Sequence, residues 1–176
     1  MKKNLEVDIM SISSIKQLER ELKQYRDSLK HKAEILAKTL AEKGVNIAQV
    51  QVADLKAIFT GELISSIHTE YKGLTKAGAI FAIVADSEHA VFVEFGTGQK
   101  GKDTPYPHPL PEGVEWEYGD GETVRKNPVT GAYYWFYPGQ DGKYHYTEGM
   151  PSRPFMYNTS MELYAMIAQT AKEIFG

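Results

Sequence analysis

Glu94 is the side chain in this sequence that most needs a chemical partner. It lies within an apolar run, residues 90–95, that stops at Gly96-Thr97-Gly98. The length of the run and its β-branched and aromatic side chains favour a buried strand. An ionised carboxylate is seldom buried without compensation. The sequence therefore predicts that Glu94 meets a positive charge or several hydrogen-bond donors.

Arg153 is the cation that the sequence pattern offers to Glu94. It is flanked by Pro151 and Pro154, which restrict the backbone around it. A guanidinium can take both carboxylate oxygens in two parallel hydrogen bonds. We therefore expect Glu94 to contact Arg153, either within one subunit or across an interface. The alternative is that Glu94 accepts hydrogen bonds from the backbone amides of the 96–98 turn while Arg153 is solvated.

The other residues with chemical potential form no familiar catalytic pattern. A metal-dependent enzyme would have to combine His68, His89 and Glu94 across a sheet, since no two of the five histidines have ligand spacing on one predicted element. The glycines of 96–98 resemble part of a phosphate loop, but Walker spacing is missing and no helix is predicted to follow, so a tight turn is expected. No serine lies in a G-x-S-x-G elbow. The sequence predicts neither an enzyme nor a cofactor.

The composition is that of one globular domain, residues 1–176. Apolar residues make up 42% and charged residues 24%, and no apolar stretch is long enough for a membrane span. The opening Met-Lys-Lys is followed by interspersed acidic residues, so no export signal is expected. Absence of cysteine excludes disulfides and thiolate metal sites.

The charge distribution is uneven along the chain. Residues 1–43 hold ten Lys and Arg against seven Asp and Glu, whereas residues 99–149 hold five against eight. No basic cluster is dense enough to neutralise several phosphates together. Tight, sequence-specific binding of nucleic acid is therefore not expected.

The first elements are predicted to be a short strand and a long helix. Residues 5–9 alternate between apolar and acidic, which is typical of an edge strand. Ser14 and Gln17 have capping-box spacing, and an apolar stripe then continues over 15–43, with Gly44 as the expected left-handed cap. A helix of that length is about 43 Å long, so it either crosses a whole domain or reaches a neighbour. A coiled-coil seam and packing on the chain's own sheet both remain open.

The next stretch predicts a hairpin. Residues 45–52 lean towards a strand, 53–59 could form two helical turns, and Thr60 could cap a short turn of helix. Strands are expected at 64–72 and 79–85, paired antiparallel around a turn near residues 73–78. One face of the second strand should carry Ile80, Ala82 and Val84, and the other Phe81 and Ile83.

Residues 99–149 are predicted to be an inserted loop or β-extension. All eight prolines lie between Pro105 and Pro154, and ten of the twenty aromatic residues lie between Tyr106 and Tyr146. A strand within 131–139 and a partner within 142–147 would form an aromatic hairpin. That hairpin, with Trp135 in it, either fills a small core or stacks on a glycan or peptide. Residues after 154 form the last helix, with Ser152 as the expected cap and Pro154 at its first position.

Four pieces of the chain resemble the tail-completion (neck, or head–tail joining) proteins of long-tailed bacteriophages. The first is the opening strand followed by a long capped helix. Thr60-Gly-Glu-Leu-Ile-Ser-Ser-Ile67 is similar to that family's "TGxLxxSI". His89-Ala-Val-Phe-Val-Glu-Phe-Gly-Thr-Gly98 is similar to "YAxxVEFGTG", with His89 in place of tyrosine. Pro151-Ser-Arg-Pro-Phe-Met156 is similar to "PxRPFM", and a terminal helix follows.

The resemblance implies an α+β fold: a small antiparallel sheet packed by a long N-terminal helix and a C-terminal helix. It implies a ring, usually hexameric, that joins the portal to the tail tube, in the virion and, during assembly, in the host cytoplasm. The partners would be further copies and other connector or tail proteins. Passing DNA would be contacted non-specifically at most, and no membrane is involved. The motif residues implied to be structural are Thr60, Gly61, Leu63, Ile67, Glu94, Phe95, Gly96, Thr97, Gly98, Arg153, Pro154 and Phe155.

Overall fold

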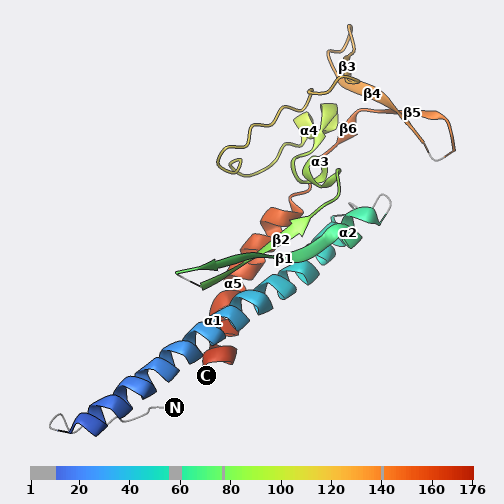
Figure 1. Cartoon of the computed structure of the whole chain (residues 1–176). Coiled ribbons are helices and arrows are strands. Elements are labelled where there is room, and N and C mark those ends of the chain that lie inside the picture. The colour runs from blue at the N-terminus through green and yellow to red at the C-terminus, as the bar shows by residue number, and fades with distance from the viewer. Residues whose placement is uncertain (1–10, 56–60, 77, 140) are drawn as a thin grey trace.

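The α+β fold predicted from the sequence is confirmed in the computed structural model, which describes residues 11–55, 61–76, 78–139 and 141–176. Figure 1 shows an elongated molecule with a helical part and a smaller β-rich part. The helical part contains α1 (Ile12–Asp54), α2 (Glu62–Ser66), the hairpin β1 (Ile67–Thr75) and β2 (Gly78–Ala85), and α5 (Phe155–Phe175). The β-rich part contains α3 (Ala90–Phe95), α4 (Gly98–Asp103), β3 (Arg125–Lys126), β4 (Tyr133–Pro138), β5 (Tyr144–Thr147) and β6 (Gly149–Met150).

Helix α1 is longer than predicted at both ends. It has 43 residues, and its N-cap is Ser11, whose Oγ accepts a hydrogen bond from the Ser14 amide at 3.4 Å. The predicted end at Gly44 and the strand tendency over 45–52 are wrong. The buried residues Ala41, Gly44, Ala48 and Val52 recur every three or four positions, so one continuous face packs on the rest of the protein, and this packing outweighs the β-branched propensity. The strand predicted at 5–9 lies outside the described residues.

Helix α5 lies antiparallel to the C-terminal part of α1. Asn158 at its start donates to Gln51 at 3.2 Å, and Lys43 donates to the Thr170 hydroxyl near its end at 3.1 Å. Lys32 contacts the carbonyl of Phe175, the last residue of α5, at 3.4 Å. The first twenty residues of α1, 12–31, therefore extend beyond the end of α5 (Figure 1). We call this segment the α1 arm.

The predicted hairpin is confirmed, with its first strand shifted. β1 and β2 pair antiparallel from Ile67–Ala85 to Thr75–Gly78, with a bulge between Tyr71 and Gly73. Residues 64–66, predicted to begin the strand, belong to the short helix α2. Helix α1 packs on both strands. The buried core beside them joins five elements through Ala48, Val52, Leu63, Ile67, Val93 and Phe155.

The run 90–95 forms helix α3, so the strand predicted there is wrong. The Ala90 amide donates to the Ser87 carbonyl at 2.9 Å, and this turn leads into the helix. The expectation that no helix follows Gly96-Thr97-Gly98 is also wrong, because α4 begins at Gly98. The aromatic hairpin is confirmed: β4 and β5 are antiparallel neighbours, and β3 completes a three-stranded sheet in the order β3-β4-β5. Among the described helices, none is both long and apolar enough to cross a membrane.

Candidate functional site at the junction of the two parts

Glu94 caps the N-terminus of α5. Its Oε2 accepts from the Met156 amide at 2.9 Å and its Oε1 from the Tyr157 amide at 3.1 Å. Pro154, the N-cap residue, makes no side-chain cap. The first amides of a helix have no partner within it, and they lie at the positive end of the helix dipole. The buried carboxylate of Glu94, only 7% exposed, thus satisfies donors contributed by an element sixty residues away.

This geometry corrects four predictions. Arg153 forms no ion pair with Glu94 within the subunit, and Glu94 does not cap the 96–98 turn, because both of its oxygens are directed at α5. Ser152 does not cap α5 either, since its hydroxyl donates to the Glu94 carbonyl at 2.6 Å. Pro154 precedes the first helical residue rather than occupying that position. A contact between Glu94 and Arg153 across a subunit interface stays a prediction.

The protonation of Glu94 reflects two opposed effects. Burial raises the pKa of the Glu94 carboxyl, and the hydrogen bonds from Met156 and Tyr157 act to lower it. Burial is the larger effect, so the net direction is upward. Burial also raises the pKa of the Tyr106 hydroxyl, with the negative charge of Glu94 as the second cause. Proton binding by Glu94 and Tyr106 is therefore coupled to the packing that buries these two side chains.

The glycines of the 96–98 motif permit two backbones to approach closely. Both have positive φ, +81° at Gly96 and +62° at Gly98. A Cβ on Gly96 would lie 2.6 Å from the Ser152 nitrogen, and one on Gly98 would lie 2.5 Å from the Glu148 carbonyl oxygen. Between them, Thr97 forms an isolated bridge with Met150. The motif thus joins α3 and α4 to the segment that leads into α5. The sequence predicted only a tight turn here and not this backbone contact.

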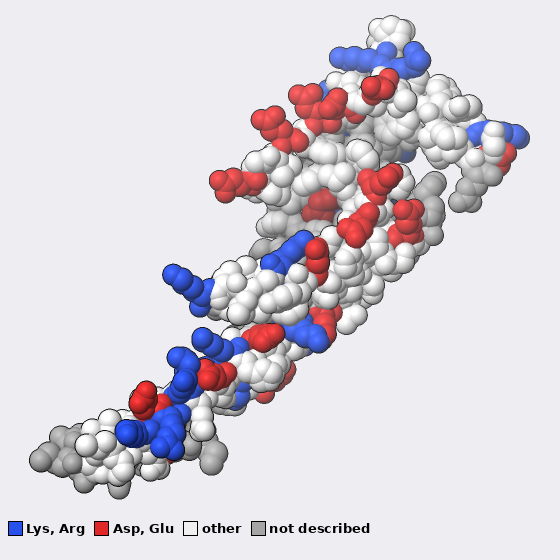
Figure 2. All heavy atoms as spheres, in the orientation of Figure 1, with Lys and Arg blue, Asp and Glu red and all other residues white. Residues whose placement is uncertain are grey.

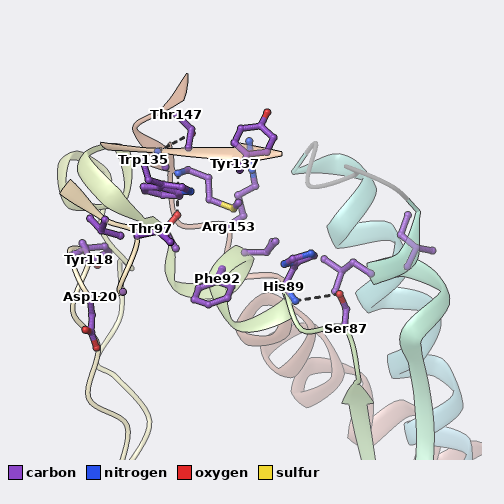
Figure 3. A pocket seen from close by; sticks show the side chains of 18 of the residues that line it. Ser87, His89, Phe92, Thr97, Tyr118, Asp120, Trp135, Tyr137, Thr147 and Arg153 are labelled. Carbon is purple, nitrogen blue, oxygen red and sulfur yellow. Dashed lines mark hydrogen bonds between the residues drawn. The ribbon is translucent and has the colours of Figure 1, made fainter. Parts of the chain in front are cut away.

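A cavity of about 600 Å³ opens between the helical part and the β-rich part. Figure 3 shows Trp135 and Tyr137 of β4 facing His89 and Phe92 across it, with Arg153 between them. The Arg153 amide donates to the Val93 carbonyl at 2.8 Å, which fixes the backbone. Within the described part of the chain, the Arg153 guanidinium has no hydrogen-bond or ion-pair partner. Sequence spacing gave no signal for this cavity, because its walls come from segments far apart in the chain.

The remaining motif residues have structural positions. Leu63, Ile67 and Phe155 belong to the buried core, and Gly61 is the left-handed N-cap of α2 and lines the cavity. Phe95 is buried beneath the proline-rich loop, where its ring lies 4.9 Å from that of Tyr106 and 5.2 Å from that of Trp116. Thr60 lies outside the described residues.

The loop residues that cover the motif were not singled out in the sequence. Trp116 donates from its indole nitrogen to the Gly96 carbonyl at 3.0 Å. The Tyr118 hydroxyl accepts from the Tyr106 amide at 3.1 Å. Only their aromatic character within a proline-rich insertion hinted that the loop is folded. The loop also reaches α5, because the ring of His108 stacks on that of Tyr157 at 3.6 Å.

The three residues considered for a metal centre do not meet. His68 contacts the Ser66 carbonyl at 2.8 Å and lies 3.7 Å from Asp86, while His89 lines the cavity. Glu94 has both oxygens occupied by α5 amides. Among the described residues, no group of three or more His, Asp or Glu is arranged to hold a metal ion.

The aromatic hairpin has two different faces. Trp135 points into the cavity, where a Cβ on Gly98 would lie 2.7 Å from its ring. Phe136, Tyr144 and Tyr146 belong to the other, open side and are 52%, 75% and 54% exposed. Trp135, which the glycan- or peptide-stacking alternative placed in the aromatic patch, therefore lies on the cavity side of the hairpin and not on its open face. Comparison of the chain with protein-family models, curated proteins and solved structures finds no match.

Proposed function

We propose that this chain is a non-enzymatic assembly protein of a bacteriophage neck, which forms a ring between the portal or connector and the tail tube and lets DNA pass. The observation that carries the proposal is the α1 arm, a helix whose apolar side chains are largely exposed in the described part of the chain. The motif residues around Glu94 and Gly96 support it, because they hold an architecture together rather than a reaction centre.

The α1 arm carries a stripe of apolar side chains that are exposed to solvent. Ile12 is 74% exposed, Leu22 50% and Tyr25 63%, and Ile15 and Leu29 continue the same stripe. The arm is about 30 Å long at 1.5 Å per residue. A contiguous apolar surface of this kind marks a protein–protein contact. A neighbouring copy of the chain is the partner that the ring hypothesis requires.

The charges favour contact between unlike surfaces. Residues 12–31 hold five Lys and Arg against three Asp and Glu, whereas the loop 104–124 holds five acidic residues and no Lys or Arg. Figure 2 shows blue side chains outnumbering red ones along the α1 arm, and red side chains along one edge of the β-rich part, with blue ones at its tip. An interface that joins two different surfaces closes into a ring when its rotation permits. The basic arm of one copy against the acidic part of the next fits that scheme.

Loss of the gene provides the direct test of the neck function. In the genome that carries it, deletion should give DNA-filled heads and separate tails, and expression of the chain from a plasmid should restore joined particles. Electron microscopy of the lysate measures both. Normal numbers of complete, infectious particles after deletion would overturn the proposal.

Substitutions in the α1 arm test self-association. The free protein should associate weakly, and Leu22→Asp or Tyr25→Asp should weaken association about tenfold or more, because each places a charge in the apolar stripe. Sedimentation velocity over a concentration series measures this. Gln24→Asp, on the opposite side of the helix, is the matched control and should associate like the parent chain. A tight dimer in which α1 pairs with itself would remove the main support for a ring.

The open face of the hairpin favours a second candidate function, a glycan- or peptide-binding module using residues 131–147. Phe136, Tyr144 and Tyr146 present their rings to solvent, and the rings of Tyr134 and Tyr146 stack at 5.6 Å. Exposed aromatic platforms of this kind can stack on sugars or peptide side chains. Titration of oligosaccharides and peptides while the tyrosine ring signals are observed by NMR would separate this candidate from a purely structural role.

A further inference from the structure

The cavity between the two parts combines apolar walls with Arg153, the arginine among the described residues that line it. Its walls include Leu63, Phe92, Tyr118, Trp135, Tyr137 and Met150. Pockets of several hundred cubic ångströms with mainly aromatic and aliphatic walls and a few polar groups are the usual form of ligand sites. An aromatic or aliphatic group of a ligand would replace water against these walls.

Arg153 supplies the polar group that orients such a ligand. Its backbone is fixed by the hydrogen bond to Val93 and by Pro151 and Pro154 on either side. Glu94, the carboxylate that the sequence pattern paired with it, accepts hydrogen bonds from two α5 amides instead. Among the described residues, no carboxylate forms an ion pair with the guanidinium. A guanidinium binds a carboxylate through two parallel hydrogen bonds. Glu94 and Arg153 are thus not paired within the subunit, and the Arg153 guanidinium is available to a ligand.

The other charges around the cavity limit the charge of the anion that Arg153 could bind. Asp120 lies at the far end of the cavity with its carboxylate turned away from the other labelled side chains (Figure 3). The loop that carries it is acidic throughout, so the surrounding potential is negative. One guanidinium can balance a single carboxylate charge but would leave a phosphate dianion unbalanced. The apolar walls likewise favour a ligand with one carboxylate over a phosphate dianion.

We infer that this cavity is a docking site for a peptide segment of a partner protein that presents an aromatic or large aliphatic side chain next to a carboxylate. Arg153 binds the carboxylate, and Phe92, Trp135 and Tyr137 enclose the apolar group. The inference is independent of ring formation, since it concerns a surface away from the α1 arm.

Binding of N-acetyl-phenylalanine and of its neutral amide, N-acetyl-phenylalaninamide, tests the inference. The two probes share the ring and differ only in the negative charge. The acid should bind at least tenfold more tightly than the amide, and inorganic phosphate should not displace it. Amide chemical-shift changes in ¹⁵N-labelled protein measure millimolar affinities and should map to residues lining the cavity. Equal affinity for acid and amide, absence of binding at millimolar concentration, or displacement by phosphate would each overturn the inference.

Variants of Arg153 identify the recognising group. Arg153→Gln should lose the preference for the acid while binding the amide as before, and Arg153→Lys should restore part of the preference. Arg125→Gln, which removes an exposed arginine outside the cavity, is the matched control and should leave both affinities unchanged. If Arg153→Gln does not fold, the acid–amide comparison on Arg153→Lys against the parent chain decides the matter. Retention of the full preference without the guanidinium would overturn the inference.

Discussion

Gly44→Leu should prevent stable folding, and even Gly44→Ala should destabilise the chain. A Cβ at position 44 would lie 2.2 Å from Cδ1 of Ile83 and 2.7 Å from Cδ1 of Leu163. Position 44 is where α1, β2 and α5 come together, so the ends of the partly buried Ile83 and Leu163 side chains would have to shift to admit the new methyl group. Alanine normally stabilises a helix by about 1 kcal/mol relative to glycine, but overpacking costs about 1–3 kcal/mol. We expect a net loss of up to about 2 kcal/mol for alanine and of about 3 kcal/mol or more for leucine.

Urea unfolding of a double-mutant cycle measures the contact directly. Ile83→Val removes the atom nearest to the new methyl group, so Gly44→Ala should cost less in that background than in the parent chain. Ser28→Ala, on the exposed α1 arm, is the control and should stabilise the chain by a few tenths of a kcal/mol. Higher stability of Gly44→Ala than of the parent chain would contradict the close crossing of the three elements.

Glu94→Ala should destabilise the chain by about 2–4 kcal/mol, because it leaves two partly buried amides of α5 without their acceptors. Glu94→Gln keeps the shape, but its NH₂ group would face one of the two donors, so a loss of about 1–3 kcal/mol is expected. Arg153→Ala should cost less than Glu94→Ala, since the two side chains do not pair within the subunit. Chemical unfolding at neutral pH compares the three variants, and a larger loss for Arg153→Ala would contradict this order.

The advantage of the parent chain over Glu94→Gln should depend on pH. Burial raises the pKa of Glu94 above its ordinary value of 4.5, so the folded chain holds this proton more tightly than the unfolded chain does. The stability contributed by Glu94 is then complete below pH 4.5 and falls as the pH rises through the folded-state pKa. Unfolding free energies of both chains from pH 4 to 8 test this. A difference that grows with pH would mean that the hydrogen bonds from Met156 and Tyr157 outweigh burial.

Local patterns predicted those elements that have a clear period or a clear boundary. The alternation and the glycine-containing turn gave the β1–β2 hairpin, and the aromatic run ended by Pro138 and Gly139 gave β4 and its partner. The apolar stripe gave the existence of α1 but not its end. Gly44 has the same appearance in sequence as a helix C-cap, and only the approach of β2 and α5 distinguishes a close crossing from a cap.

The junction could be predicted only in part, because its partners are main-chain groups. The need of Glu94 for a partner was evident from its apolar neighbours. Its donors are the backbone amides of Met156 and Tyr157. Backbone amides cannot be recognised from residue type, whereas the positive charge of Arg153 can. The run 90–95 is too short for its period to separate strand from helix, and tertiary contacts decided it. The cavity arises only when β4 is placed over α3, which no local pattern encodes.

The exposure of the α1 arm has a thermodynamic consequence for the order of assembly. Most of its apolar side chains are exposed among the described residues, and a helix that lacks tertiary packing is only marginally stable in water. In the free chain the arm would therefore open locally at far lower free energy than the segment around Ala48. Docking against a neighbour would then supply the ordering energy, so that each added subunit rigidifies the helix it covers. In the ring proposed above, subunit addition would be a coupled folding reaction, in which the exposed arm of the last subunit stays flexible until the next copy binds.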